Sequence, residues 1–518
     1  MLFRERRIYG VAAAAFAGLI LAGCGDSGAE QQKLAAEITK GVEDYLALVE
    51  TPNQPFRIHH DKVAVTPAED GKSFLVAITG LRYGSDTVAR ATFGEVDYRL
   101  TPQDKDLYQV SDLKIAKEVP ILNADGKPEA SVKFETTAFS GIWSKPLQNF
   151  LKLDWQLKDI SASATDRPGE VFHIATAAMT SDGKEGGKGL LDQVATVVIS
   201  GLSASDPADG TNIKMDKLTG HVTVAGLDFP GYRQMMAKLN ALTPKFQAPL
   251  PEASGAAPAV PGVSEDDRKA LADLVRGIPK LMSAYAYDFS AEGLTVVDGS
   301  QKTLVQLGQG GIGLGLKGIN TDHAELSFGI KHDGLVLNGP AYEDPMVKAV
   351  LPKSGNLSLV ATDLPLPSLL EGVAQSLPVL TSADPETAQG GQIMMMGALM
   401  SALSQSKIKL RIDPSALKTE RASLSADGEL RLAMETPEKA VGAINLVLVG
   451  LDDLIALATE QAQQSPIANQ AMAILPMIQS FAQRETGADG KPVDKFKVDM
   501  TETGSVLVNG KSLEGMAP

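Results

Sequence analysis

The chain contains very little cysteine. Cys24 is the only one among 518 residues. A lone thiol cannot close a disulfide within the chain, and it cannot supply the several thiolates of a structural zinc site. The fold must therefore be held together by packing.

Recognisable catalytic motifs are also missing. The sequence has no GxSxG elbow, no HExxH pair and no Walker loop. SxxK occurs at Ser111–Lys114, Ser181–Lys184 and Ser404–Lys407, but no KTG element accompanies it, and we interpret all three as chance. We predict no catalytic residue, no cofactor and no metal site, and hence a protein that is not an enzyme. A hydrolase whose catalytic residues converge only in the fold is the least favoured alternative.

Two other patterns have a structural interpretation. Gly308, Gly310 and Gly313 match the letters GxGxxG, but the following residues Glu325–Ile330 alternate like a strand and do not open a helix. A dinucleotide site needs that helix, so we predict a glycine-rich strand. The neighbouring His59-His60 would point to opposite faces of a strand, which disfavours a shared metal.

Acidic pairs stand near two expected helix starts, at Asp266-Asp267 and Asp452-Asp453. Carboxylates there satisfy free N–H groups and complement the helix dipole. We predict capping at both pairs and no acid–base catalysis.

Basic residues are outnumbered. The formal charge is −15, and loss of residues 1–23, which hold three Arg and one Glu, would leave about −17. Nucleic acids and anionic membrane surfaces would repel such a body. We therefore expect no nucleic-acid partner.

The N-terminal residues have the three parts of a secretory signal. Arg4, Arg6 and Arg7 precede an apolar run at 8–21, and Leu21-Ala22-Gly23-Cys24 ends it. The run is shorter than the ~20 residues of a membrane-spanning helix. This segment resembles the lipobox of bacterial lipoproteins. The resemblance implies a signal peptide at 1–23, and a diacylglyceryl group on the sulfur of Cys24 and an acyl group such as palmitate on its freed amine.

The same resemblance implies a location in the bacterial cell envelope, lipid-anchored and facing the periplasm. Gly25, and not an aspartate, follows the cysteine. By the enterobacterial rule this slightly favours the outer membrane over the inner one, and both stay open. An acylated Cys24 would also leave no thiol nucleophile.

A first half is expected at 31–246, after a polar tether at 24–30. Leu34, Ile38, Val42 and Leu46 are spaced like one face of an amphipathic helix. Strand-like segments follow, and alternation is clearest in Leu151–Lys158. Asp-Gly dipeptides predict turns at Asp70-Gly71, Asp125-Gly126, Asp182-Gly183, Asp298-Gly299, Asp333-Gly334 and Asp427-Gly428.

A Pro/Ala-rich linker is expected at 247–265, before a second half at 266–518. The segments Ile58–Val65 and Phe289–Val296 are similar, and both follow a helix pattern. A unit of strand, polar turn and helix occurs at Val222–Asp228, Leu357–Asp363 and Leu446–Asp452. We predict an α+β, β-rich fold with long, largely antiparallel curved sheets, amphipathic helices and two similar halves.

Methionine is concentrated in Ile393–Met400. Flexible thioethers suit surfaces that accept varied apolar partners, but we favour a buried helix core. The apolar stretch Leu454–Phe481 could close the core or line a groove.

The strand–turn–helix unit and the ending Val506–Lys511 resemble uncharacterised YdgA-like envelope proteins and, more loosely, the AsmA-like group. The resemblance implies long curved sheets with an apolar inner surface and, for the AsmA-like group, a proposed role with envelope lipids. We therefore expect a non-enzymatic, membrane-tethered lipoprotein that binds a lipid or another apolar ligand. The alternative is a structural or assembly partner of another envelope protein, reached through strand edges or the acidic face.

Overall fold

The computed structural model contains two compact units. It describes residues 28–49, 57–84, 89–103, 106–147, 149–165, 170–186, 189–206, 209–246, 263–382, 384–404, 406–433, 439–488 and 490–512. The first unit falls within Met1–Gln193 and Asp228–Gln247, and the second within Val194–Leu227 and Ala248–Pro518. Strands hold 53% and helices 29% of the residues, which confirms the predicted β-rich α+β class.

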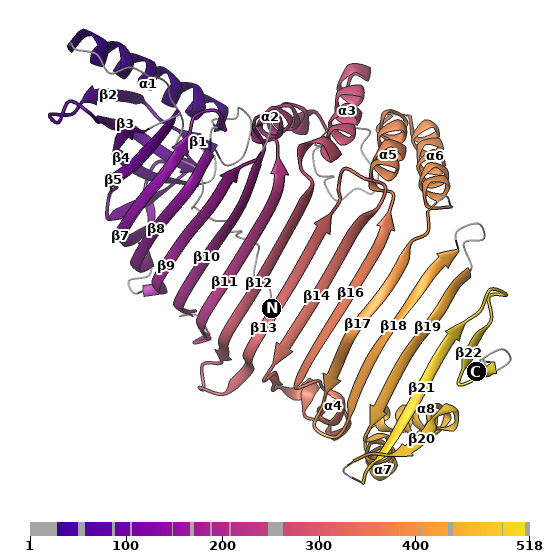
Figure 1. Ribbon diagram of the computed structural model, residues 1–518. Coiled ribbons are helices and arrows are strands. Elements are labelled where there is room, and N and C mark those ends of the chain that lie inside the picture. Colours follow the sequence, from indigo (N-terminus) through magenta and orange to yellow (C-terminus); the bar gives the residue numbers. More distant parts are fainter. Residues whose placement is uncertain are drawn as a thin grey trace. The chain divides into compact units, whose positions relative to one another are not determined.

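The first unit is an antiparallel sheet with a helix packed on one face (Figure 1). Strand β3 pairs with β1, β2 and β4, the short strands β5 and β6 both lie between β4 and β7, and β7, β8 and β9 follow in order. The elements are α1 Gly28–Val49, β1 Arg57–His59, β2 Lys62–Pro67, β3 Phe74–Gly84, β4 Ala89–Pro102, β5 Leu107–Lys114, β6 Glu118–Asn123, β7 Pro128–Ser144, β8 Asn149–Ala164, β9 Glu170–Glu185 and α2 Phe229–Phe246.

The second unit is a longer antiparallel sheet in the order β11, β12, β13, β14, β16, β17, β18, β19, β21, β22, β23. Strand β15 also pairs with β13, and β20 with β21. The strands are β10 Leu191–Ser205, β11 Asn212–Leu227, β12 Ala284–Val297, β13 Thr303–Lys317, β14 Ala324–Asp333, β15 Val336–Leu337, β16 Ser354–Leu364, β17 Lys409–Lys418, β18 Ser423–Ala433, β19 Lys439–Val449, β20 Gln483–Thr486, β21 Pro492–Met500, β22 Val506–Val508 and β23 Lys511–Ser512.

Helices of the second unit lie at the strand ends (Figure 1). They are α3 Glu265–Leu281, α4 Pro345–Val350, α5 Leu366–Leu380, α6 Pro385–Ser404, α7 Leu451–Gln461 and α8 Pro466–Phe481, with a 3₁₀ turn η2 at Pro340–Tyr342. Helix α5 packs on both α3 and α6 at one end, and α4, α7 and α8 share a buried cluster at the other.

The predicted boundaries need adjustment. Helix α1 begins at Gly28, so residues 28–30 of the expected tether are helical, and Cys24 and the rest of 1–27 lie outside the described residues. Most of the expected linker 247–265 also lies outside them, and its last residue already belongs to α3. Strand β11 pairs with β12 in the second unit, so the sheet continues from one side of that linker to the other.

The strand–turn–helix unit is present at all three predicted places. Strands β11, β16 and β19 are each followed within two residues by a helix. Each junction needs left-handed backbone, with φ of 62° at Gly226, 57° at Asp363 and 90° at Gly450. The other proposed similarity does not form equivalent strands: Ile58–Val65 is divided between β1 and β2, whereas Phe289–Val296 lies within β12 alone.

Two predicted turns are wrong. Asp182-Gly183 lies inside β9, and Asp427-Gly428 lies inside β18. A Cβ at Gly428 would overlap the carbonyl oxygen of Ala443 on the adjacent strand. Close approach of two strands explains this glycine, and a local sequence pattern cannot distinguish that need from a turn.

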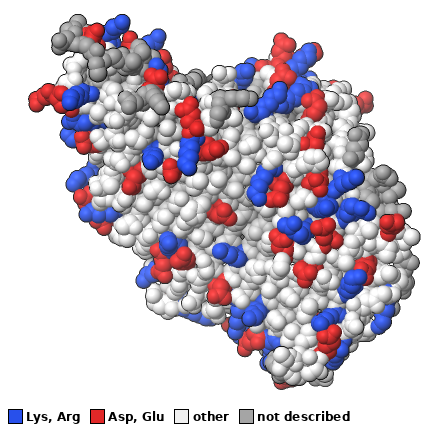
Figure 2. All heavy atoms as spheres, viewed as in Figure 1, with Lys and Arg blue, Asp and Glu red and all other residues white. Residues whose placement is uncertain are grey.

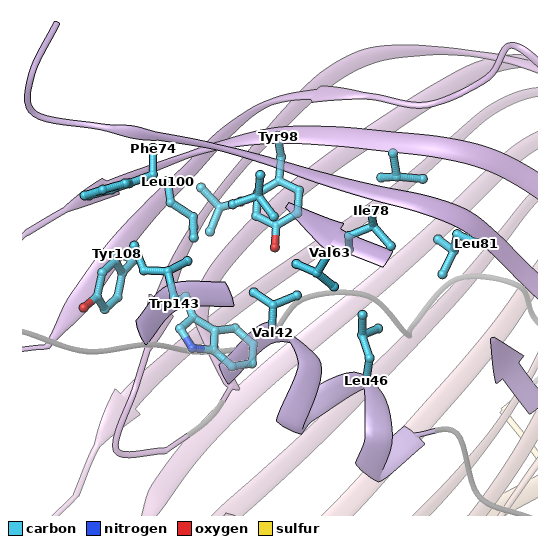
Figure 3. Packing of buried hydrophobic residues seen from close by; sticks show 14 of the residues in the cluster. Val42, Leu46, Val63, Phe74, Ile78, Leu81, Tyr98, Leu100, Tyr108 and Trp143 are labelled. Carbon is cyan, nitrogen blue, oxygen red and sulfur yellow. The ribbon is translucent and has the colours of Figure 1, made fainter. Parts of the chain in front are cut away.

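Helix α1 supplies the core of the first unit. Ile38, Val42 and Leu46 are at most 1% exposed and recur every four residues, as the helical spacing predicts. Figure 3 shows Val42 and Leu46 directed toward Val63 and Ile78 of the sheet. Each such buried side chain contributes about 1.5–3 kcal/mol through removal of apolar surface from water.

Both tryptophans of the chain, Trp143 and Trp155, lie in the first unit, on β7 and β8. Trp143 is 3% exposed in the core. Its ring makes edge contacts with Tyr45 of α1 at 5.9 Å and with Phe150 at 5.1 Å between centroids. Tryptophan fluorescence therefore reports on this unit alone.

Leu46→Ala should lower the free energy of unfolding of the first unit by about 2–5 kcal/mol, because it leaves a cavity between α1 and the sheet. Leu75→Ala is the matched control, since Leu75 is 45% exposed on β3 and should cost well under 1 kcal/mol. Urea titration followed by tryptophan fluorescence measures both. Equal effects of the two substitutions would contradict the packing of α1.

The turn between β2 and β3 is organised by Asp70. Its carboxylate accepts hydrogen bonds from Ser73 Oγ at 2.6 Å, from the backbone N–H of Lys72 at 2.8 Å and from that of Ser73 at 2.9 Å. Arg99 Nη1 lies 3.2 Å away. These interactions, the Ser73 hydroxyl foremost, lower the pKa of Asp70 to about 2.

The pKa of Asp70 is lower in the folded protein than in the unfolded chain, where it is near 4, so the ionised carboxylate stabilises the fold at pH values above about 4. This contribution is lost as the pH falls toward 2. Asp70→Asn keeps an acceptor oxygen but removes the titration. Between pH 5 and pH 2.5, the variant should lose less stability than the wild type in urea titrations read by tryptophan fluorescence. Parallel losses in the two proteins would show that Asp70 does not couple folding to pH.

Candidate functional site

The sheet of the second unit separates apolar from polar side chains. Directly paired residues on antiparallel strands point to the same side, so register assigns every residue to a face. Phe289 pairs with Ile312, Ile312 with Ile330, and Ile330 with Leu357. We call this side the apolar face; it comprises Leu218, Val222, Val224, Tyr285, Tyr287, Phe289, Ile312, Leu314, Leu316, Leu326, Phe328, Ile330, Leu357, Leu359, Ala361, Leu410, Ile412, Leu417, Leu424, Leu430, Ile444, Leu446, Leu448, Phe496 and Val498.

The opposite side of the same strands is polar. Lys317 Nζ lies 2.8 Å from Glu325 across β13 and β14, and Asn445 Nδ2 donates to Asp427 at 3.0 Å across β18 and β19. Glycines 311, 313 and 315 of β13 point to this side as well. Figure 2 shows basic and acidic side chains interspersed over the strands of this unit. Solvated groups of both signs are typical of a water-facing sheet surface.

The apolar face is incompletely buried. Ile330 is 46% exposed, Phe289 41%, Leu326 37% and Leu357 37%. The inner face of a two-layer domain would be nearly inaccessible to water. The helices of this unit lie at the strand ends (Figure 1), and these four side chains stay partly open to water.

The extent of the face is large. The face crosses eight strands: β11, β12, β13, β14, β16, β17, β18 and β19. At a spacing of about 4.8 Å between strands, and with four alternate residues spanning about 20 Å along each, its area is on the order of 700 Å². The largest apolar patch of a typical soluble monomer is about 300–600 Å² and is often functional. Only part of this area is exposed to water, and the exposed part around Phe289, Ile330 and Leu357 is the candidate binding surface.

One edge of the apolar face is closed by α8. Phe481 at the end of α8 packs with Phe496 of β21 and Val508 of β22 in a buried cluster. Asn509 Nδ2 donates to the carbonyl of Phe481 at 2.8 Å and fixes the helix end. The exposed part of the face therefore lies on the strands before β21.

An ion pair between a buried carboxylate and a partly exposed arginine lies beside this closed edge. Asp494 of β21 is only 1% exposed and accepts hydrogen bonds from Arg484 Nε at 2.8 Å and Nη2 at 3.1 Å. Arg484 Nη2 also donates to Asp452 of α7 at 2.9 Å. Hydrogen bonds to both carboxylates raise the pKa of Arg484, so it is always charged. Arg484, which lies on β20, therefore links this strand to β21 and α7.

Arg484→Met should destabilise this edge by about 2–4 kcal/mol, since it leaves the buried Asp494 carboxylate without its cation. Lys495→Met removes the exposed pair with Glu485 on the same two strands and should cost less than about 1 kcal/mol. Hydrogen exchange of the β19 and β21 amides measures both effects. The double variant Arg484→Met with Asp494→Leu should regain stability; failure to do so would mean that the cost is not electrostatic.

The Met-rich segment corrects one sequence prediction. Ile393 is 71% exposed, Met394 50% and Met396 56%, so the buried-core interpretation of Ile393–Met400 is wrong for these residues. Helix α6 packs on α5 through small residues: a Cβ at Gly391 would overlap the backbone of Leu380. Close packing on one side leaves the methionines on the other side in solvent.

The stretch Leu454–Phe481 has both predicted properties. Leu454 and Leu457 of α7 are buried with Ala468 of α8, so this part closes a core. Along α8, Ile474 and Met477 are each 49% exposed. Helices at both ends of the strands thus present apolar side chains to solvent.

The structure does not bring the sequence candidates into a catalytic arrangement. Ser111–Lys114 lies in β5, Ser181–Lys184 in β9, and Ser404 at the end of α6. The glycine motif lies within β13, which confirms a strand there and gives no helix for a pyrophosphate. His59 ends β1.

The acidic pairs fall in first helical turns, as predicted. Asp267 completes a capping box with Ser264 at the start of α3. Asp452 lies in the first turn of α7, whose N-cap is Gly450, and it also binds Arg484. Capping is therefore confirmed for the first pair. At the second pair no side chain caps the start of α7, so the capping prediction is wrong there, and Asp452 pairs with Arg484.

Metal-binding and membrane-spanning features were examined over the described residues. No three His, Cys, Asp or Glu side chains among them gather closely enough to hold a metal ion. In the same part of the chain, every helix is too short or too polar to cross a bilayer. Cys24, the predicted lipidation site, lies outside it.

Sequence reasoning expected an apolar sheet surface only through a resemblance and did not name its residues. Its signal was present, since each of these strands alternates apolar and polar residues. Alternation predicts one buried side but does not say what buries it. Comparisons with family models, curated proteins and solved structures found no match for this chain.

Proposed function

We propose that this protein is a non-enzymatic envelope lipoprotein, tethered through acylated Cys24, that binds lipid acyl chains on the apolar face. The observation that carries the proposal is the exposure of Phe289, Ile330 and Leu357 on three strands of one continuous face. Covering such side chains with hydrocarbon lowers the free energy by about 25 cal/mol for each Å² of apolar surface removed from water.

Acyl chains suit this surface for a geometric reason. On β12–β16 the apolar face carries mostly aliphatic and aromatic groups, and its polar atoms there are those of Tyr285, Tyr287 and His332, so a ligand needs few polar atoms. Methylene chains are flexible and have no hydrogen-bonding demand. The polar side of the sheet stays in water whether or not the apolar side is occupied.

The assembly-partner alternative has less support at one edge. Strand β21 is covered on its outer side by β20 near Pro492–Lys495 and by β22 near Val498–Met500. Short covering strands are a common device against pairing with other chains. Among the described strands, this edge therefore offers little free backbone for another protein.

The test uses the full chain in proteoliposomes that contain a phospholipid with a photoactivatable acyl chain. Crosslinked peptides, identified by mass spectrometry, should come from β12–β16. Phe289→Glu with Leu357→Glu should lower crosslinking about tenfold or more, since a carboxylate against hydrocarbon costs at least 1.4 kcal/mol.

The matched control is Ser290→Glu with Asn356→Glu. These residues are the immediate neighbours of the first pair on β12 and β16, point to the polar face, and add the same charge. The control should crosslink like the wild type. Equal crosslinking of both double variants would refute binding on the apolar face. A photoreactive residue at Leu357 that captures one dominant protein in cells, and no lipid, would favour the assembly role.

A further inference from the structure

The distance between the predicted anchor and the fold is very short. Helix α1 begins at Gly28, four residues after Cys24. Four extended residues reach at most about 14 Å, which is about twice the thickness of one headgroup layer, so the N-terminal end of α1 stays close to the bilayer surface. We infer that the N-terminal end of α1 and the β2–β3 turn hold the first unit against lipid headgroups. This inference rests on the lipid anchor of the proposed function.

Helix α1 cannot swing away from its sheet to lengthen this tether. Ala35, Ile38, Val42 and Leu46 are between 0 and 5% exposed and pack on β2, β3 and β4. Detaching the helix would transfer all four side chains to water. The anchored end of α1 and the rest of the first unit therefore move as one body.

The β2–β3 turn is fixed beside the same end of the helix. Gln31 Nε2 donates to the carbonyl of Gly71 at 2.6 Å. The turn itself is closed by two backbone bonds, from Ala68 N to Ser73 O at 2.8 Å and from Gly71 N to Ala68 O at 3.0 Å. A membrane within reach of α1 is thus also within reach of residues 68–73.

Charge at this end is nearly balanced, although the chain as a whole is strongly acidic. Its two regions hold Glu30, Glu69, Asp70, Lys33 and Lys72, and the turn is bonded to Arg99, which also pairs with Asp112. Arg99 lies 3.2 Å from Asp70 and 2.9 Å from Asp112, so four acidic groups face three basic ones. Near balance of charge weakens the repulsion that an anionic bilayer exerts on the rest of the chain.

The consequence is a fixed position for the first unit. A flexible insert of about 20 Gly and Ser residues would span about 25 Å and release this end from the headgroups. The native chain has no such slack between Cys24 and α1.

The experiment places a fluorophore on Lys72→Cys, an exposed position in the turn. Acylated Cys24 leaves the new residue as the single free thiol. The full chain is reconstituted in vesicles of phosphatidylethanolamine and phosphatidylglycerol that include lipids with a headgroup quencher. The comparison protein carries the same label and the Gly/Ser insert after Ser27, outside the described fold.

Quenching should be strong in the native-length protein and fall severalfold in the extended one. An unquenched native-length label on an acylated protein would refute the docking while the anchor stands. Equal quenching in both proteins would refute control by tether length. Intact-mass analysis separates these cases from failure of the proposed function, because a protein without acyl groups at Cys24 would remove the anchor itself.

Discussion

The structure depends on the two-residue period of its strands, which gives each sheet two chemically different sides. In the second unit, register places apolar residues of eight adjacent strands on one side and polar residues on the other. A sheet with one apolar side must cover it to be stable in water. Here the helices lie at strand ends, and the central side chains stay accessible.

The two units cover the apolar side of the sheet to different extents. In the first unit, α1 lies across the sheet and brings Ile38, Val42 and Leu46 into a closed core. In the second unit, Phe481 of α8 closes only one edge of the apolar face. The first unit therefore resembles an ordinary packed domain, while the second retains an apolar surface that is partly exposed to water.

Local sequence predicted the elements well where their signal was local. The helix at Leu34–Leu46 and the alternating strand at Leu151–Lys158 are both found. Predictions failed where the cause was non-local: Gly428 satisfies a neighbouring strand, and Met394 is exposed because Gly391 brings α6 close to α5. Neither cause can be read from adjacent residues, since each depends on a partner distant in the sequence.

The sequence alone determined the class of the fold, the helical face of α1, the strand–helix units and the absence of recognisable catalytic motifs. These follow from periodicity, composition and turn chemistry within short segments. Only the tertiary structure decided which apolar residues are covered. Strand register brings residues between Leu218 and Val498, which are distant in the sequence, onto one face of the sheet. The positions of the helices decide how much of that face is exposed to water.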